Sequence, residues 1–462
     1  MNPFLDPRFL IRVTKSYLRD IDRLRRWDEE TLRSFRNKQL QTMVRRAFST
    51  PLYNDLYKQS GITHDDIKTM DDIGKLPIIS KEDFKGRDPT DLVPKGIDPS
   101  SLIKVSTSGT TGKSLSIYVN MYEIIMGLFG YLRTTREYGF HWRKHKLSII
   151  GDFAPHTAET GYVKRGLVPN TIFPSLFKNI QWLDTNDPPE KVLHELEKFK
   201  PDFIGGYTGM LGHLAVLRSQ GKGKDICPRV IASTGALLDP KLKEFIESTL
   251  NTEVFEVYGA TETGPIAFQC KEEKIYHIMS DLLHLEFLNE ENEPTVSKQA
   301  GHLVVTKLFG GGTPIIRYNA INDIVSPLYE KHDCGLSGDL IDKIYGRDSI
   351  RLYRKDGKIV LASSLSSIFS RLLYELQTSK VREMKVIQQH LDHVDMQLVI
   401  DQTIEKDGPS AEEIQASLER GFKEKFGKDM TVSFEQVTEV SRSEPRIISR
   451  VDPKTLKITG FI

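Results

Sequence analysis

The residues best suited to chemistry form one polar run that directly follows an apolar segment. Residues 102–105 spell LIKV and predict a short strand. Two glycines in the following run let the backbone approach an anion, and hydroxyls with successive N–H groups can donate to phosphate oxygens. The Walker spacing is absent, and a Ser/Thr/Gly turn is an equally good interpretation of the run alone. The run comprises Ser106, Thr107, Ser108, Gly109, Thr110, Thr111, Gly112 and Lys113.

A second group of residues has the chemistry of a metal site. Cys270 and His277 are separated by six residues, and His332 and Cys334 form an H-x-C pair farther along the chain. Two thiolates and two imidazoles suit tetrahedral Zn²⁺, although neither spacing is that of a zinc finger. The alternative is two buried cysteines and two surface histidines. Because four protein ligands leave no open position, the ion would be structural and not catalytic.

The length, net charge and cysteine count limit which folds, partners and locations are expected. The chain has 462 residues, more than one hydrophobic core usually supports, so we expect at least two domains. A net charge of +1 gives no bulk field to recruit nucleic acid. We expect no membrane span and no signal peptide, and the odd count of 3 cysteines fits a reducing compartment, so the expected location is the cytoplasm. The sequence is silent on oligomeric state.

The elements that must position these residues alternate along the middle of the chain. Helical patterns lead in from Glu29 to Tyr57, and the segment 75–80 predicts a short strand before a helix that Ser80 caps with Asp83. From residue 101 onward, β-rich runs alternate with helical stretches such as 188–200 and 240–250, which predicts a mainly parallel sheet with crossover helices.

Two changes of pattern mark the remaining organisation. Between Ile275 and Val325 the helices give way to hairpin-like runs, which predicts an antiparallel subdomain. After Gly346 a hairpin, helices at 363–377 and 410–426, and three intervening strands predict a small α+β domain. The expected fold class is therefore α/β, with a large multi-sheet N-terminal domain at residues 1–346 and an α+β C-terminal domain at 347–462.

Several motifs, in order along most of the chain, resemble one known family. The polar run at 106–113 resembles the SSGTTGKP-type loop of the adenylate-forming (ANL) superfamily. The segments LPIISKEDF (76–84), YGATETGP (258–265), PIIRYNAINDIV (314–325) and DKIYGRD (342–348) look like the phenylacetate-CoA ligase group and its capsule-biosynthesis-like relatives. The resemblance implies an ATP- and Mg²⁺-dependent enzyme with a mobile C-terminal domain.

The resemblance also implies roles for single residues. Tyr258 would lie on the adenine face, Glu262 would supply an oxygen to Mg²⁺, and Asp323 would accept hydrogen bonds from the ribose. Taken singly, these positions have ordinary alternatives. Tyr258 could be a buried aromatic, the STGA loop a tight turn, and Asp323 or Arg347 a surface charge. The other implied nucleotide contacts are Gly259, Ala260 and Thr261 beside Tyr258, Gly235 and Ala236 in the STGA loop, and Arg347 near the domain junction.

The same resemblance suggests where the acid would bind. A pocket built from Tyr207, Gly235, Thr263 and Phe268 would suit an aromatic or apolar carboxylic acid. The resemblance also implies three catalytic residues. They are Glu262, Thr110 of the polar run and Arg446 of the C-terminal domain.

Two departures from the family pattern bear on activity. Where relatives have a SEGKxxR-like stretch with a catalytic lysine, residues 443–450 read SEPRIISR, so Arg446 stands at the lysine position. Arginine keeps the charge but is planar and forked. The region after the GRD element contains Gly357 but otherwise matches the CoA-binding loop poorly, and Ser349 takes the pivot position.

The sequence thus favours an AMP-forming acid-thiol ligase that converts a carboxylic acid and ATP to an acyl-adenylate, then transfers the acyl group, with CoA the leading acceptor. An amine, a hydroxyl or a carrier-protein thiol stays open as acceptor. The rivals are an adenylyltransferase or amide ligase of the same fold, and a nucleotide-binding scaffold of a surface-polysaccharide pathway that no longer catalyses.

Overall fold

The computed structural model describes residues 3–106, 115–154, 157, 159–167, 177–401, 403, 408–441 and 444–462, with the side chains of 165–167 excepted. The chain divides into two compact units. The first unit comprises Met1–His145, Gly151–Ile180 and Val257–Lys343, and the second unit comprises Lys146–Ile150, Gln181–Glu256 and Ile344–Ile462.

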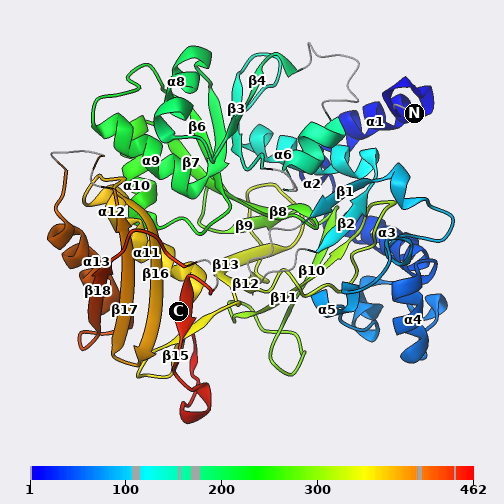
Figure 1. Ribbon diagram of the computed structural model, residues 1–462. Coiled ribbons are helices and arrows are strands. Elements are labelled where there is room, and N and C mark those ends of the chain that lie inside the picture. Colours follow the sequence, from blue (N-terminus) through cyan, green and yellow to red (C-terminus); the bar gives the residue numbers. More distant parts are fainter. Residues whose placement is uncertain are drawn as a thin grey trace. The chain divides into compact units, whose positions relative to one another are not determined.

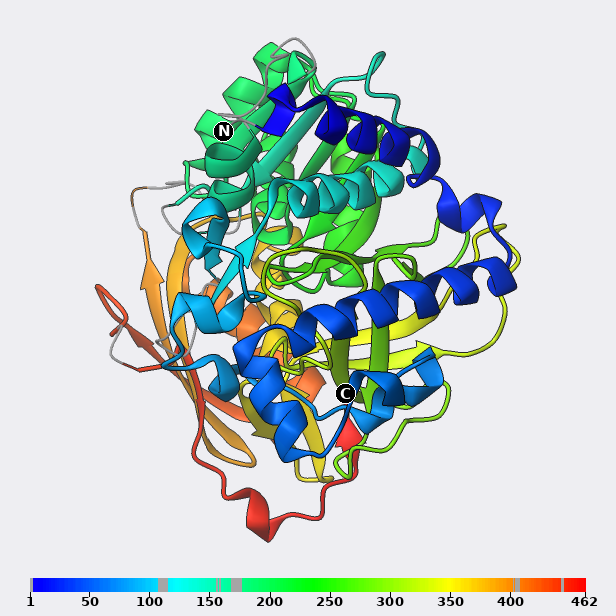
Figure 2. The same ribbon diagram turned by 90° about the vertical axis from the view of Figure 1, so that its right-hand side faces the viewer.

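Helices dominate the N-terminal part of the first unit. Asp28 caps the long helix α3 by accepting from the Thr31 N–H at 2.8 Å. Helix α3 lies across the strands of this unit (Figure 2), and its Arg36 contacts His284 Nδ1 at 2.8 Å. The helices are α1 (Pro7–Arg19), α2 (Arg23–Arg26), α3 (Glu29–Phe48), α4 (Pro51–Gln59), α5 (Lys81–Phe84) and α6 (Met121–Glu137).

The predicted cap of α5 is confirmed, but the strand predicted before it is wrong. Asp83 accepts from the Ser80 N–H and hydroxyl, both at 2.7 Å. The segment 75–80 forms only a single bridge, from Ile79 to Tyr318. Pro77 has no N–H to donate to a ladder, so pairing stops after one residue.

The strands of the first unit are antiparallel, as predicted for residues 275–325. Strands β1 (Ile103–Ser106) and β2 (Ser116–Val119) form a separate hairpin around the polar run. The others follow the order β10-β11-β12-β13-β9-β8-β7. Their bounds are β7 (Glu253–Ala260), β8 (Gly264–Gln269), β9 (Tyr276–Ile278), β10 (Leu283–Leu288), β11 (Gly301–Lys307), β12 (Asp323–Leu328) and β13 (Leu340–Arg347).

The predicted parallel sheet lies in the second unit, in the green and cyan part of Figure 1 that carries β3, β4, β6 and β7. Its order is β7-β6-β5-β3-β4, and the first half of β7 belongs to it. The apolar faces of the neighbouring helices pack on it through Leu211, Leu214 and Ile246, each 2% exposed or less. Its elements are β3 (Leu147–Gly151), β4 (Ile180–Asp184), α8 (Pro189–Phe199), β5 (Phe203–Tyr207), α9 (Thr208–Ser219), β6 (Val230–Thr234) and α10 (Pro240–Leu250).

The C-terminal part of the second unit has the predicted α+β character and a core of its own around Val386, Leu398 and Phe422. The helix predicted at 363–377 is instead two short helices interrupted at Ser370. The sheets have the orders β14-β15-β20 and β18-β17-β16-β19. The elements are β14 (Arg351–Tyr353), β15 (Lys358–Leu361), α11 (Ser366–Phe369), α12 (Arg371–Tyr374), β16 (Val381–His390), β17 (His393–Ile400), α13 (Ala411–Phe426), β18 (Thr431–Gln436), β19 (Ile447–Ser449) and β20 (Gly460–Phe461).

Residues 344–462 belong to the same compact unit as the parallel sheet, and the division of the chain at residues 346 and 347 stays a prediction. Short helical turns complete the described chain. They are a π-helix at Thr160–Leu167 and 3-10 turns at Pro3–Leu5, His64–Asp66, Met70–Lys75, Pro89–Leu92, Pro99–Ser101, Ala362–Leu365 and Pro453–Thr455.

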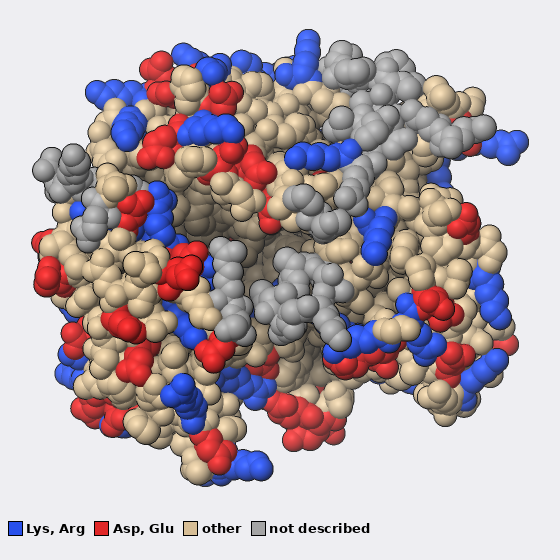
Figure 3. Space-filling view, viewed as in Figure 1, with Lys and Arg blue, Asp and Glu red and all other residues tan. Residues whose placement is uncertain are grey.

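The surface agrees with the near-zero net charge. Acidic and basic side chains are interspersed on the face drawn in Figure 3. Among the helices described, none combines the length and the apolar character that a bilayer crossing needs.

A buried ion pair anchors the segment that follows the polar run. Glu123 and Lys307 are each no more than 4% exposed in their side chains, and their charged atoms are 2.8 Å apart. Glu123 also accepts from the N–H groups of Gly311 and Gly312, at 2.8 and 2.7 Å. A Cβ at Gly312 would come within 1.9 Å of the Tyr118 carbonyl, so only glycine allows this approach to β2.

We expect Lys307→Met to lower the free energy of unfolding by about 3–5 kcal/mol, because it leaves the Glu123 carboxylate buried and uncompensated. Urea or thermal unfolding measures the loss. The double variant Glu123→Gln/Lys307→Met should recover part of it, because no charge is left buried.

The matched control is Lys191→Met, which breaks the exposed pair with Asp187 and should change stability little. Equal losses in Lys307→Met and Lys191→Met would contradict the anchoring role of the buried pair.

Candidate functional site

The YGATETGP motif forms a tight hairpin between β7 and β8. Ala260 pairs with Gly264, and the N–H of Thr263 donates to the Ala260 carbonyl at 3.3 Å. Gly264 has a φ of +76°, the left-handed conformation that closes three-residue hairpin loops. Thr261, Glu262 and Thr263 therefore form the tip. Glu262 is 7% exposed and Thr263 is 3% exposed, so this tip is buried and does not project into solvent.

Two residues predicted to bind the adenosine meet directly. The hydroxyl of Tyr258, near the end of β7, donates to Oδ2 of Asp323, the first residue of β12. Asp323 is 8% exposed. Asn322 before it adopts a left-handed φ of +59°, and its N–H donates to the Asn319 carbonyl at 2.9 Å. This turn directs the chain into β12 and fixes the position of the Asp323 backbone, from which the carboxylate extends.

The Glu262 carboxylate has a tyrosine partner of its own. The Tyr318 hydroxyl donates to Glu262 Oε1 at 3.0 Å, and Tyr318 is 1% exposed. Tyr318 belongs to the PIIRYNAINDIV motif, which also carries Asp323. Two carboxylates predicted to touch different parts of ATP thus each accept a hydrogen bond from a tyrosine in the first unit.

Of the polar run, the structure describes only the first residue, Ser106. Ser106 ends β1, and its hydroxyl lies 3.2 Å from that of Ser116 on β2. The predicted phosphate contacts Thr107, Ser108, Gly109, Thr110, Thr111, Gly112 and Lys113 lie outside the described residues.

Phe268, predicted to line the acid pocket, lies in the core at 1% exposure. Its ring packs against Tyr138 at 6.4 Å and against His277 at 5.5 Å between ring centroids. A place for Phe268 in an acid pocket stays a prediction.

Three predicted residues sit together in the second unit. Gly235 follows β6 with a φ of +82°, and a Cβ there would lie 2.3 Å from the Tyr207 ring, so the loop needs glycine on both counts. The Ala236 carbonyl accepts from the Thr208 hydroxyl at 3.0 Å. The STGA turn and Tyr207 are therefore neighbours, and their place in an acid pocket stays a prediction.

Arg347 and Arg446 also belong to the second unit. Arg347 is the last residue of β13. Arg446 precedes β19, its carbonyl accepts from the Val386 N–H at 2.8 Å, and its guanidinium is 56% exposed with Glu383 3.4 Å away. The roles of both arginines stay predictions.

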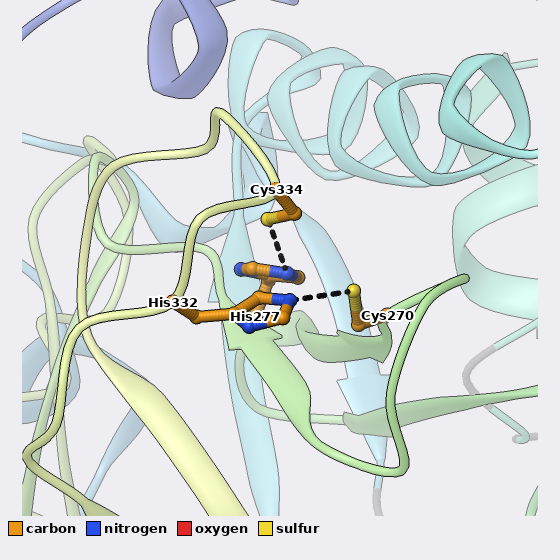
Figure 4. A group of neighbouring side chains, drawn as sticks. All are labelled: Cys270, His277, His332 and Cys334. Carbon is orange, nitrogen blue, oxygen red and sulfur yellow. Dashed lines mark hydrogen bonds between the residues drawn. The ribbon is translucent and has the colours of Figure 1, made fainter.

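The four predicted metal ligands converge in the first unit (Figure 4). Cys270 follows β8, His277 lies in β9, and His332 with Cys334 lie in the loop after β12. Cys270 Sγ is 3.3 Å from His332 Nε2, Cys334 Sγ is 3.2 Å from His277 Nε2, and all four ligand atoms lie within 4.8 Å of one another. Tetrahedral Zn²⁺ would space its ligands by roughly 3.5 Å, so the donor set and geometry fit that ion.

Burial shifts the pKa values of two residues in this Cys/His cluster. His277 is 2% exposed, which is inconsistent with the alternative of a surface histidine. Burial lowers the pKa of His277 to about 4, so the imidazole is neutral at pH 7 and able to ligate. Burial, followed by neighbouring Cys270, raises the pKa of Cys334. A bound divalent ion would reverse that second effect by stabilising the thiolate.

Sequence reasoning missed the tyrosines that hold the hairpin tip. Tyr318 reaches Glu262, and the Tyr162 hydroxyl donates to the Thr261 carbonyl at 2.7 Å. Tyr318 lay inside a recognised motif, but Tyr162 lies in a π-helix with no such motif. Local π-helical geometry often marks functional segments, yet nothing in the residue pattern predicts it.

Comparisons with known proteins extend over nearly the whole chain. A family profile described as the CapK C-terminal domain matches residues 352–445. Protein CapK of Staphylococcus aureus is 23% identical over 445 residues, covering 93% of this chain and 90% of CapK. Phenylacetate-coenzyme A ligase of Escherichia coli (strain K12) is 23% identical over 301 residues, covering 63% of this chain and 66% of the ligase.

Solved structures of 2-hydroxyisobutyryl-CoA ligase have a similar fold. In its postadenylation state, in complex with R3-HIB-AMP, that ligase matches with a TM-score of 0.69 at 16% identity, over 90% of this chain and 88% of the ligase. In its thioesterification state, with 2-HIB-AMP and CoA, the TM-score is 0.63 at 15% identity, over 92% of this chain and 91% of the ligase. These structures, at 16% and 15% identity, show the fold alone. The ordered motifs, the CapK profile and the similarity to CapK over most of the chain identify it as a CapK-like and phenylacetate-CoA ligase-like member of the adenylate-forming superfamily.

Proposed function

We propose that the protein activates a carboxylic acid with ATP. A carboxylate oxygen of the acid attacks the α-phosphorus of ATP, and the bond to the leaving pyrophosphate breaks, which gives an acyl-adenylate. A nucleophile then attacks the acyl carbon and AMP leaves. The observation that carries this proposal is the pairing of Asp323 with Tyr258 and of Glu262 with Tyr318 in one unit.

Each pair has a role in this scheme. Asp323 accepts hydrogen bonds from the ribose hydroxyls, while the Tyr258 hydroxyl holds that carboxylate in place and the Tyr258 ring lies against adenine. Glu262 supplies an oxygen ligand to Mg²⁺, which when bound offsets negative charge on the phosphates. A hydrogen-bonded, largely buried carboxylate is a suitable donor for a hard cation, and Glu262 meets that description.

Arg446 supplies positive charge as the α-phosphorus is attacked, in place of the lysine of relatives. Its pair with Glu383 is exposed and 3.4 Å long. Such exposed pairs contribute little, so the guanidinium can exchange Glu383 for a phosphate oxygen at small cost.

The acyl acceptor we favour is the thiol of CoA, with Mg²⁺, ATP and a small carboxylic acid as the other partners. The 2-hydroxyisobutyryl-CoA ligase matched above binds CoA and an acyl-AMP, which supports this choice for a chain of the same fold. An amine, a hydroxyl or a carrier thiol stays open because Gly357 lies in a segment that matches the CoA-binding loop poorly.

We further propose a structural Zn²⁺ in the Cys/His cluster. Four protein ligands close the coordination shell, so the ion would bind no substrate and would tie the ends of β8 and β12 to β9.

We expect a screen of carboxylic acids to find acids that trigger the release of pyrophosphate from MgATP. Without such an acid, the protein should release none. Enzyme-coupled phosphate detection measures it. The adenylyltransferase alternative predicts AMP attached to a hydroxyl in the product and no free AMP. The scaffold alternative predicts ATP binding without pyrophosphate release for any acid.

Variants of Arg446 give the matched arms of that screen. Removing the charge in Arg446→Ala should lower kcat by about 10²–10³-fold, as loss of a transition-state donor does. Arg446→Lys keeps the cation and should lose far less. Equal rates in the parent and both variants would refute the role of Arg446.

The purified protein should hold about one Zn²⁺ per chain by elemental analysis, because the cluster supplies a full set of four donors. Cys270→Ser or Cys334→Ser should lose the ion and lower Tm, and a chelator should lower the Tm of the parent to the same level.

Cys227→Ser is the control, because Cys227 is exposed and outside the cluster. A metal-free parent whose Tm is insensitive to added Zn²⁺ and to chelator would contradict the zinc site.

A further inference from the structure

We propose that Tyr318 is a positioning residue that sets the direction in which the Glu262 carboxylate faces the metal ion of MgATP, an inference that rests on the proposed function. The Tyr318 hydroxyl lies 3.0 Å from Glu262 Oε1, and both side chains are buried, at 1% and 7% exposure. A carboxylate can rotate about its last torsion angle with little preference. One fixed donor selects a rotamer for it.

The backbone that carries Tyr318 is held on both sides. Tyr318 exchanges two hydrogen bonds with Val305 of β11, each 2.9 Å long. On its other side the Ile79 N–H donates to the Arg317 carbonyl at 2.8 Å, and the Asn319 N–H donates to the Ile79 carbonyl at 3.0 Å. The Phe84 ring meets the Tyr318 ring edge-on at 5.7 Å between centroids. The ring of Tyr318 therefore has little freedom to move away from Glu262.

Arg317 fixes the same segment through a conformation that a non-glycine residue rarely adopts. Its φ is +45°. The guanidinium makes two bonds to Glu286, at 3.0 and 2.8 Å, and donates to the carbonyls of Gly74 and Leu76. The backbone N–H of Arg317 donates to Thr306 Oγ1 at 2.9 Å. Strained residues persist where surrounding contacts determine them fully, and such residues gather near functional sites.

The hairpin tip is held from a second direction as well. The Tyr162 hydroxyl donates to the Thr261 carbonyl at 2.7 Å, so one tyrosine holds the backbone beside Glu262 and another holds its carboxylate. A tip fixed at both points presents Glu262 in one geometry before any nucleotide arrives. Partners that orient a metal ligand in this way typically change metal affinity by about 10–100-fold when removed.

A purely structural role for Tyr318 predicts something different. Removing a buried hydroxyl would then lower stability without changing how Glu262 binds a metal. Tyr138 provides the matched comparison, since it is 4% exposed and its hydroxyl donates to the Gln269 carbonyl at 2.8 Å in the same unit. Tyr138→Phe removes a buried hydroxyl that bonds neither Glu262 nor the segment that carries Tyr318.

The test is the affinity of the full chain for Mn²⁺–ATP, measured by the EPR signal of Mn²⁺ as a replacement for Mg²⁺, with Tm recorded for every variant. The variants are Tyr318→Phe, Tyr138→Phe, Glu262→Gln and the double variant Glu262→Gln/Tyr318→Phe. We expect Tyr318→Phe to weaken Mn²⁺–ATP binding by about 10–100-fold and Tyr138→Phe to leave it unchanged. The double variant should bind as weakly as Glu262→Gln alone, because the two residues act as one unit.

The outcomes separate this inference from the function it rests on. Weak binding by Glu262→Gln with parental binding by Tyr318→Phe would overturn the positioning role and leave the proposed function intact. Parental binding by Glu262→Gln would overturn the role of Glu262 itself, and the positioning role with it. If Tyr318→Phe fails to fold, Arg317→Lys loosens the same segment without touching Glu262, and parental Mn²⁺–ATP binding by that variant would overturn the inference.

Discussion

The first unit depends on keeping two carboxylates in place while they are largely removed from water. A buried carboxylate is unfavourable unless donors satisfy it, and a phenol hydroxyl that donates to a carboxylate is among the stronger hydrogen bonds. Tyr258 satisfies Asp323 in this way, and Tyr318 satisfies Glu262. A ligand that needs these acceptors then finds them already oriented, so less of its binding energy is lost to ordering the protein.

The scaffold explains how that arrangement is maintained. Glu262 precedes β8 and Asp323 opens β12, and the Cys/His cluster lies at the other ends of these strands, with Cys270 after β8 and His332 after β12. A metal ion in the cluster would therefore connect the same two strands that carry the proposed nucleotide carboxylates. The antiparallel pairing through β9 and β13 lies between them in the sheet order. Strands β8 and β12 thus each carry a proposed nucleotide carboxylate at one end and a residue of the Cys/His cluster at the other.

Much of this could be predicted from the sequence where the signal was local or repeated. The capping box at Ser80 and the alternation of strands and helices follow from short-range chemistry, and both are present. The meeting of Cys270, His277, His332 and Cys334 was predicted from donor type. The bonds of Tyr318 and Tyr162 could not be predicted, because they join segments 56 and 99 residues apart. The strand predicted around Pro77 was wrong for a local reason, because proline has no N–H to donate to a ladder and only one bridge forms there.

The central claim is that Asp323, held by Tyr258, binds the adenosine end of ATP. The most direct measurement is isothermal titration of the parent protein and of Asp323→Ala with MgATP in the absence of any acid, with Tm recorded for both. The account predicts that Asp323→Ala weakens MgATP binding by at least about tenfold, since one charge-assisted hydrogen bond contributes roughly 1.5–3 kcal/mol. Parental affinity in a folded Asp323→Ala variant, or no MgATP binding by the parent, would contradict it.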